Sequence, residues 1–177
     1  MKKIEISELR QSLDTLNAGD KILLSGIAYT ARDAAHKRMF EEGIPFPIKD
    51  AVIYYAGPTP TPPGEVCGSF GPTTSSRMDS FTPELYKQGL VATIGKGDRS
   101  EEVTKSIVAH GGIYLVAIGG AGALCADCIC SLEEIAFADL GCESVKKVKF
   151  KDFPLIVAID SKGKSVFNRE QYRKKSI

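Results

Sequence analysis

The chain has 177 residues, of which 43% are hydrophobic and 25% are charged, and its 23 basic side chains nearly balance 22 acidic ones. These values are typical of a soluble globular protein, so we expect a single domain over residues 1–177. The balanced charge excludes a general attraction to nucleic acid or to an anionic membrane, and any anion site must be local. No apolar run approaches the roughly 20 residues of a membrane span, which predicts a cytoplasmic protein.

The N-terminal part of the chain predicts a strand between two helices. Apolar residues at helical spacing over 4–16 indicate a short helix after a possible strand, and the apolar run 21–27 indicates a buried strand. Thr30 and Asp33 have the spacing of a capping box, so the second helix is expected to begin at Thr30. This start places Arg32 in the first helical turn.

An arginine in the first turn of a helix is electrostatically unfavourable unless an anion is nearby. The N-terminus of a helix already presents unpaired N–H groups and positive potential, and a bound anion would relieve the conflict at Arg32. His36 lies one turn later on the same face, where it contacts the same ligand, orients Arg32, or is simply buried and hydrogen-bonded. Asp33 is expected to pair with Lys37, four residues later.

The rest of the chain continues the alternation of strands and helices. The predicted strands are 50–56, 90–94, 113–118, 135–137, 145–150 and 154–160, the predicted helices are 82–89 and 100–110, and a polar tail, helical or frayed, covers 168–175. The proline-rich connection 57–64 is a pocket wall, a partner contact or a spacer. Repeated junctions of this kind predict an α/β layered domain, in which ligand-binding loops gather at the C-terminal ends of the strands.

The polar segment 71–79 is the strongest candidate site. It reads Gly-Pro-Thr-Thr-Ser-Ser-Arg-Met-Asp and contains hardly any apolar side chain, so it does not build a core. One interpretation is a turn that caps the helix near Pro83, with Arg77 as a solvated charge; the other is a ligand site. Lys96 adds a second local anion site between two glycines after a strand. Cations at Arg32, Arg77 and Lys96 would together suit a dicarboxylate.

Three of the five cysteines, Cys125, Cys128 and Cys130, lie close together in the sequence. A metal site would need a further protein ligand, and no second cysteine pair or histidine-rich segment provides one. Cys125 and Cys128 are expected on one face of a helix. We therefore favour ordinary core packing for these thiols.

The segments 26–38, 55–60, 71–79, 94–97 and 152–154 resemble, in this order, the β subunit or C-terminal domain of class I fumarases and L-tartrate dehydratases. The likeness covers nearly the whole chain. The combination of Gly-Pro-Thr-Thr-x-x-Arg-Met-Asp with Arg-Asp-x-x-His is highly specific to that family.

The resemblance implies a swivelling β/β/α catalytic domain that works with an α subunit holding an oxygen-sensitive four-iron four-sulfur (4Fe-4S) cluster on three cysteines. The open iron of that cluster acts as a Lewis acid on the substrate. The residue matching Thr73 is assigned as the base that takes the C3 proton of malate. The residues matching Arg32, Thr74, Arg77 and Lys96 bind the carboxylates of the substrate. His36 belongs to the matched motif without an assigned role, and this chain itself is expected to bind no cofactor.

A threonine hydroxyl is a poor base unless a neighbouring group accepts its proton. We expect an acidic partner for Thr73, either on the α subunit or, within this chain, at Asp79. The expected activity is the interconversion of fumarate and L-malate by a hydro-lyase that is active only as a heteromer. The alternatives are an L(+)-tartrate dehydratase β subunit and a non-catalytic dicarboxylate-binding module.

Overall fold

The computed structural model describes residues 1–168, which form a mixed α/β structure. The strands are β1 (Lys2–Glu5), β2 (Lys21–Thr30), β3 (Val52–Tyr54), β4 (Ala92–Gly95), β5 (Ile113–Val116), β6 (Ile129–Ala136) and β7 (Val145–Ile159). The α-helices are α1 (Leu9–Ser12), α2 (Asp33–Glu42), α3 (Thr82–Lys87), α4 (Glu101–His110) and α5 (Gly122–Ala126), and the 3-10 segments are η1 (Ile6–Glu8), η2 (Leu13–Thr15), η3 (Ser75–Met78) and η4 (Ala138–Glu143). The predicted tail beyond residue 168 lies outside the described residues.

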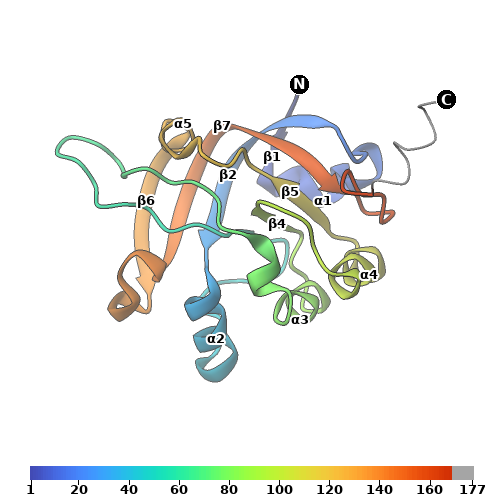
Figure 1. Ribbon diagram of the computed structural model, residues 1–177, viewed down its shortest axis with the longest axis horizontal. Coiled ribbons are helices and arrows are strands. Elements are labelled where there is room, and N and C mark those ends of the chain that lie inside the picture. The colour runs from blue at the N-terminus through green and yellow to red at the C-terminus, as the bar shows by residue number, and fades with distance from the viewer. Residues whose placement is uncertain (169–177) are drawn as a thin grey trace.

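Within residues 1–168 the strands form one sheet in the order β1-β2-β3-β4-β5-β7-β6, and β2 also pairs with β7. Strands β1 to β5 pair with one another in parallel, whereas β7 is antiparallel to β2, β5 and β6. The long strand β7 pairs along both of its edges and thereby closes the sheet into a barrel. Helices α2, α3 and α4 lie on one side of the sheet, and α5 lies near β6 and β7 (Figure 1). The expected α/β class is confirmed.

Two hydrophobic clusters hold the ends of the central strands in place. Successive side chains of a strand point to opposite faces. Val52 and Tyr54 therefore belong to one cluster, together with the apolar residues of β1, η1 and α1. Ile53 and Tyr55 belong to the other cluster, which includes the apolar faces of α2, α3 and α4. Full burial of each large apolar side chain contributes about 1.5–3 kcal/mol, so the C-terminal ends of β2, β3 and β4 are rigidly placed.

The predicted start of the second helix is wrong. Thr30 is the last residue of β2, and its hydroxyl accepts a hydrogen bond from the Lys146 backbone at 3.1 Å and donates to the Ser144 carbonyl at 3.4 Å. These bonds to the β7 side use the hydroxyl that would otherwise cap a helix. Helix α2 begins instead at Asp33, and Arg32 is its N-cap, with extended backbone angles φ −104° and ψ −170°.

The bounds predicted for the C-terminal strands also differ from those in the structure. The segments 145–150 and 154–159 belong to one strand, β7, which continues through Asp152 at a positive φ of 51° and ends one residue before the predicted end at 160. Pro154 was expected to start a new strand but lies within the ladder. Residues 135 and 136 are the end of the longer strand β6, and Phe137 is the N-cap of η4. Pairing with β2 on both sides of a register shift at Leu24–Gly26, which only the tertiary structure provides, keeps these residues in one strand.

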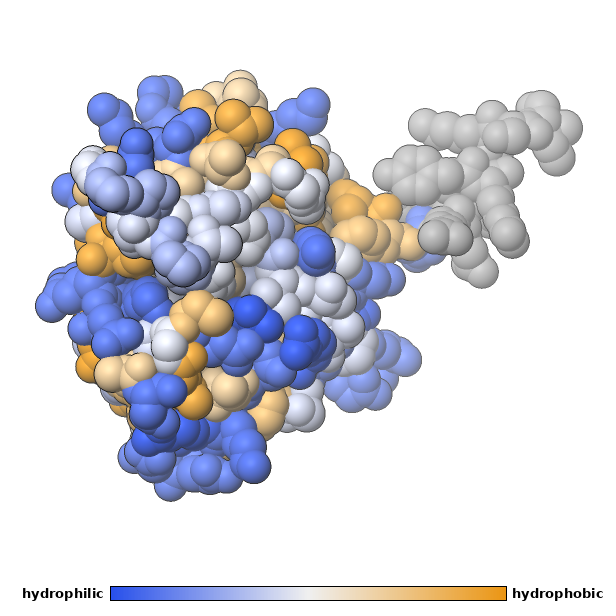
Figure 2. Space-filling view, turned by 60° about the vertical axis from the view of Figure 1, so that its left-hand side comes forward, coloured by the Kyte–Doolittle hydropathy of each residue, from blue (hydrophilic) through white to orange (hydrophobic). Residues whose placement is uncertain are grey.

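The surface shown in Figure 2 is mostly hydrophilic, and its apolar side chains form small separate groups. Across residues 1–168, none of the helices has both the length and the apolar character that crossing a membrane requires. The apolar side chains of the molecule are instead gathered mainly in the two internal clusters.

Candidate active site

The predicted site segments meet at one edge of the sheet. Arg32 follows β2, Tyr55 follows β3 and Lys96 follows β4, and the parallel strands bring these positions to the same edge. The backbone of Thr73 donates to the Tyr55 carbonyl at 2.6 Å and accepts from the Lys96 N–H at 3.2 Å, while the Ser75 N–H donates to the Lys96 carbonyl at 2.9 Å. The 73–75 segment is thereby attached to the ends of β3 and β4.

The side chains of this segment are open to solvent to different degrees. Thr73 is half-buried, whereas Thr74 and Lys96 are exposed. The Arg77 side chain is 50% exposed and the Arg32 side chain is 22% exposed. The five residues predicted to act on a substrate therefore lie on connected segments at one accessible edge.

Asp33 links the two arginines. Its Oδ2 accepts a hydrogen bond from Arg77 Nη2 at 2.7 Å, and its Oδ1 lies 4.0 Å from Arg32 Nε. Arg32 Nη2 also contacts Glu143 Oε1 at 2.8 Å. The predicted pair between Asp33 and Lys37 is wrong, because the fold brings Arg77 to Asp33 from a distant part of the sequence. Arg77 is thus neither a free solvated charge nor an isolated ligand-binding group.

His36 is completely buried beneath Arg32. Its Nδ1 lies 2.8 Å from the Arg32 carbonyl oxygen, which only accepts hydrogen bonds, so Nδ1 carries the proton. Burial lowers the pKa of His36 to about 4, with a smaller contribution from the charge of Arg99, and the ring is neutral at neutral pH. His36 therefore fixes the backbone of Arg32. Within the described residues, His36 Nε2, Arg32 Nε and Asp33 Oδ1 are buried without a hydrogen-bond partner.

Arg99 is a buried arginine next to the site segment, and the sequence did not indicate its role. The Arg99 side chain is 0% exposed and donates to Asp79 Oδ1 at 2.6 Å, Thr93 Oγ1 at 3.0 Å and Thr82 Oγ1 at 2.7 Å. Its sequence context, between Asp98 and a helix start, is typical of a surface loop. The only signal was the number of polar side chains on neighbouring elements, which a buried cation requires.

Asp79 belongs to this buried network. Its Oδ1 accepts from Arg99 and its Oδ2 accepts from the Ser100 N–H at 2.7 Å. Both oxygens therefore already have donors, and the suggested role of Asp79 as the acidic partner of Thr73 stays a prediction. The Tyr114 hydroxyl lies 2.8 Å from Ser75 Oγ and extends the network to the 73–75 segment.

The close approach of Ser75 to β4 depends on a glycine. A Cβ atom at Gly95 would lie 2.0 Å from Ser75 Oγ, so any larger residue at position 95 would displace the segment. The 73–75 segment is therefore positioned both by its contacts with β4 and by the buried Arg99 network.

The cysteines near α5 behave differently from one another. Cys125 is buried in a hydrophobic cluster, as the packing interpretation predicts, and burial raises its pKa. Cys128 is half-buried and lies beyond the end of α5, so the expected shared helix face is wrong. Cys130 lies exposed on β6. Among residues 1–168, no three His, Cys, Asp or Glu side chains are grouped so that they could hold a metal ion.

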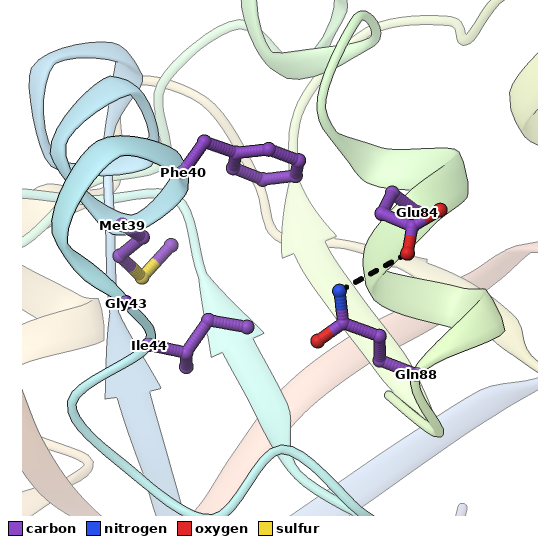
Figure 3. Close-up of a pocket in the computed structure, with 6 residues that line it drawn as sticks. All are labelled: Met39, Phe40, Gly43, Ile44, Glu84 and Gln88. Atoms are coloured by element: carbon purple, nitrogen blue, oxygen red, sulfur yellow. Dashed lines mark hydrogen bonds between the residues drawn. The ribbon is translucent and has the colours of Figure 1, made fainter.

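Figure 3 shows a hollow between α2 and α3, and none of the predicted site residues lines it. Its volume is about 250 Å³, and the Gln88 amide donates to Glu84 Oε1 at 3.2 Å on its α3 side. The lining contains a carboxylate and no basic side chain, so it does not suit a dianion. The lining residues are Met39, Phe40, Gly43, Ile44, Glu84 and Gln88.

The family model described as "Fumarase C-terminus" matches residues 1–170, so the chain belongs to this family. Fumarate hydratase 2 of Leishmania major is 42% identical over 175 residues, which cover 94% of this chain and 31% of that protein. The aerobic class I fumarate hydratase of Escherichia coli is 40% identical over 173 residues, which cover 94% of this chain and 32% of that protein.

A shorter relative has nearly the length of this chain. The putative L(+)-tartrate dehydratase subunit beta of Methanocaldococcus jannaschii is 37% identical over 179 residues, which cover 93% of this chain and 92% of that protein. The chain thus spans about a third of the fumarate hydratases that it matches and nearly all of this dehydratase subunit. These homologues place the chain in a family of hydro-lyases.

Proposed function

We propose that this chain is the β subunit of a hydro-lyase that interconverts fumarate and L-malate. In this proposal the chain is a catalytic domain of the swivelling β/β/α type and works with an α subunit that holds a 4Fe-4S cluster. The observation that carries the proposal is the arrangement of Arg32 and Arg77 around Asp33, at the same sheet edge as Thr73 and Lys96. The family membership and the hydro-lyase homologues support it.

The basic side chains suit both the ground state and the reaction. Fumarate and malate each carry two carboxylates, and Arg32, Arg77 and Lys96 provide charge-assisted donors for them. Removal of the C3 proton of malate builds negative charge on the adjacent carboxylate. Donors that are fixed in advance stabilise this charge more in the transition state than in the ground state. Thr74, exposed beside Lys96, adds a hydroxyl donor to the carboxylate site.

Thr73 takes the proton in the proposed reaction. Its backbone is hydrogen-bonded to Tyr55 and Lys96, which fixes the position from which the Thr73 side chain extends. The hydroxyl must pass its own proton to an acceptor. Because Asp79 is engaged by Arg99 and by a backbone amide, we assign this acceptor to the α subunit. The cluster of the α subunit supplies a Lewis acid for the substrate hydroxyl when the two subunits are assembled.

Anaerobic reconstitution tests the proposal. The chain is purified alone and together with a co-expressed cluster-bearing α subunit, and both samples are assayed with fumarate, L-malate and L-tartrate. We expect no turnover by the chain alone and reversible hydration of fumarate by the complex. A complex that forms but converts none of the three diacids would refute the proposal and leave a non-catalytic dicarboxylate-binding module.

L(+)-tartrate dehydratase is the second candidate. The Methanocaldococcus jannaschii relative named as a β subunit of that enzyme matches this chain over 92% of its own length. Turnover of L-tartrate in preference to L-malate by the same complex would establish this alternative. One additional substrate hydroxyl separates the two substrates, and a single hydrogen-bonding residue is enough to distinguish them.

A further inference from the structure

Both arginines of the candidate site already contact carboxylates of the chain itself. Glu143 Oε1 lies 2.8 Å from Arg32 Nη2, and Asp33 Oδ2 lies 2.7 Å from Arg77 Nη2. Asp33 Oδ1 is within 4.0 Å of Arg32 Nε, so acidic and basic groups alternate along the line Glu143, Arg32, Asp33, Arg77. Two carboxylates of the chain itself thus form ion pairs with the two arginines that are proposed to bind a dicarboxylate.

The two internal carboxylates are held very differently. Asp33 is the first residue of α2, in the rigid part of the fold. Glu143 is the last residue of η4, a mainly exposed segment that is interrupted at Gly141 by the non-helical angles φ 58° and ψ −120°. Glu143 can leave Arg32 by rotation of its own long side chain, whereas Asp33 is also paired with Arg77 and would have to give up that contact as well.

The approach of η4 to Arg32 is built into the neighbouring segments. Lys146 Nζ donates to the Gly141 carbonyl at 3.1 Å and to the Cys142 carbonyl at 3.3 Å, which gathers the end of η4 around one ammonium group. A Cβ atom at Gly57 would lie 2.5 Å from the Cys142 carbonyl oxygen and 3.5 Å from Arg32 Cδ. A glycine at position 57 thus makes room for η4 beside the arginine.

The contact with Glu143 leaves one N–H donor of Arg32 without a hydrogen-bond partner among the described residues. Glu143 contacts Nη2, whereas Arg32 Nε is buried and has no hydrogen-bond partner within residues 1–168. An arginine presents a planar fork that binds a carboxylate through two parallel hydrogen bonds. A ligand carboxylate that engaged the fork in this way would satisfy a donor that the internal contact leaves unsatisfied.

We infer that Glu143 is an internal competitor that occupies Arg32 in the free chain and is displaced by a carboxylate of the substrate. This inference rests on the proposed function and concerns the same site. A dianion gains contacts with Arg77 and Lys96 as well, which compensate for the loss of the internal pair. A monocarboxylate gains only the contact with Arg32, so Glu143 selects for ligands with two carboxylates.

The test measures dicarboxylate binding to the purified chain by NMR titration with L-malate, with acetate as the monocarboxylate. The Arg32 Nε–H signal reports on the exchange directly. Glu143→Gln keeps the shape of the side chain but removes its charge. We expect this variant to bind L-malate about three- to ten-fold more tightly and to bind acetate measurably, because the ligand no longer has to displace an internal ion pair from Arg32.

Asp139→Asn is the matched control. Asp139 lies in the same η4 segment, pairs with Arg38 at 2.7 Å and has a side chain that is 69% exposed. Its replacement removes the same charge from the same segment without altering Arg32. We expect the affinity for L-malate to stay within about two-fold of the wild type, because solvent screens this exposed charge.

The outcomes separate the proposed role of Glu143 from the proposed carboxylate site. Equal or weaker binding of L-malate by Glu143→Gln would overturn the inference, because Glu143 would then orient Arg32 instead of competing for it; the proposed function would be unaffected. An equal gain in Asp139→Asn would also overturn it, since the effect would reflect net charge alone. Absence of L-malate binding to both the wild type and Glu143→Gln would overturn the proposed carboxylate site, and the inference with it.

Discussion

Replacement of Arg99 by methionine should strongly destabilise the protein. The Arg99 side chain is 0% exposed, and Asp79, its ion-pair partner, is 14% exposed. Removal of one member of a buried ion pair leaves the other charge uncompensated, which costs about 3–5 kcal/mol. Thr82 and Thr93 lose a charged donor as well, but their hydroxyls keep the neighbouring contacts with Met78 and Tyr86. We therefore expect Arg99→Met to lower the free energy of unfolding by about 3–5 kcal/mol.

A double-mutant cycle separates the ion pair from general damage to packing. Asp79→Asn leaves Arg99 as a buried cation without its carboxylate partner and should cost a similar amount. The double variant Arg99→Met with Asp79→Asn contains neither uncompensated charge. It should therefore be no more destabilised than either single variant, which corresponds to a coupling energy on the order of 3 kcal/mol.

The cycle is measured by urea unfolding at pH 7, followed by circular dichroism because the chain contains no tryptophan. The reasoning would be refuted by a loss below about 1 kcal/mol in Arg99→Met, or by strictly additive losses in the double variant. Either result would mean that solvent reaches Arg99 and compensates for its partner.

Three further predictions concern the site. In the assembled enzyme, Thr73→Ala should lower kcat by about 100-fold or more with little change in KM, because general-base catalysis is lost while the carboxylate donors remain. Arg77→Lys should raise KM and lower kcat together, since lysine lacks the planar fork. Because the His36 pKa falls from 6.5 to about 4 on folding, the unfolded chain binds the proton more tightly. The free energy of unfolding is therefore independent of this group above pH 6.5, and it decreases as the pH falls from 6.5 to 4. This contribution should amount to about 2 kcal/mol between pH 7 and pH 5 and should be absent in His36→Gln.

Each of these predictions has its own control or contrary result. An unchanged kcat in Thr73→Ala would remove that hydroxyl from the mechanism, and wild-type kinetics in Arg77→Lys would show that charge alone is recognised there. His110→Gln is the control for the pH experiment, because His110 is the second of two histidines and is exposed. If His110→Gln and His36→Gln had the same pH dependence of unfolding, the buried neutral state of His36 would be contradicted.

Local sequence was sufficient where the signals for structure are themselves local. Pro83 lies in the first turn of α3, as its missing N–H predicts. Ser100 caps α4 and accepts a hydrogen bond from the Val103 N–H at 3.3 Å. The same type of signal failed at Thr30, because the competing partners of its hydroxyl are Ser144 and Lys146, more than 100 residues later in the chain.

The sequence also indicated which segments form the candidate site. The cations Arg32, Arg77 and Lys96 predict a dicarboxylate ligand, because such a ligand needs several charge-assisted donors, whereas the role of Thr73 is implied only by the family resemblance. It did not reveal that Asp33 joins two of the cations, since that contact depends on the register of distant segments.

The sequence by itself determined the α/β class, most of the helices, the family and the segments that carry basic and hydroxyl side chains. Only the tertiary structure decided that β7 closes the sheet, that Arg99 is buried under the 73–75 segment and that Glu143 lies on Arg32. The physical reason is the range of the interactions. Helix starts and turns depend on residues a few positions apart, whereas strand pairing, burial of a charge and long-range ion pairs depend on which surfaces the folded chain brings together.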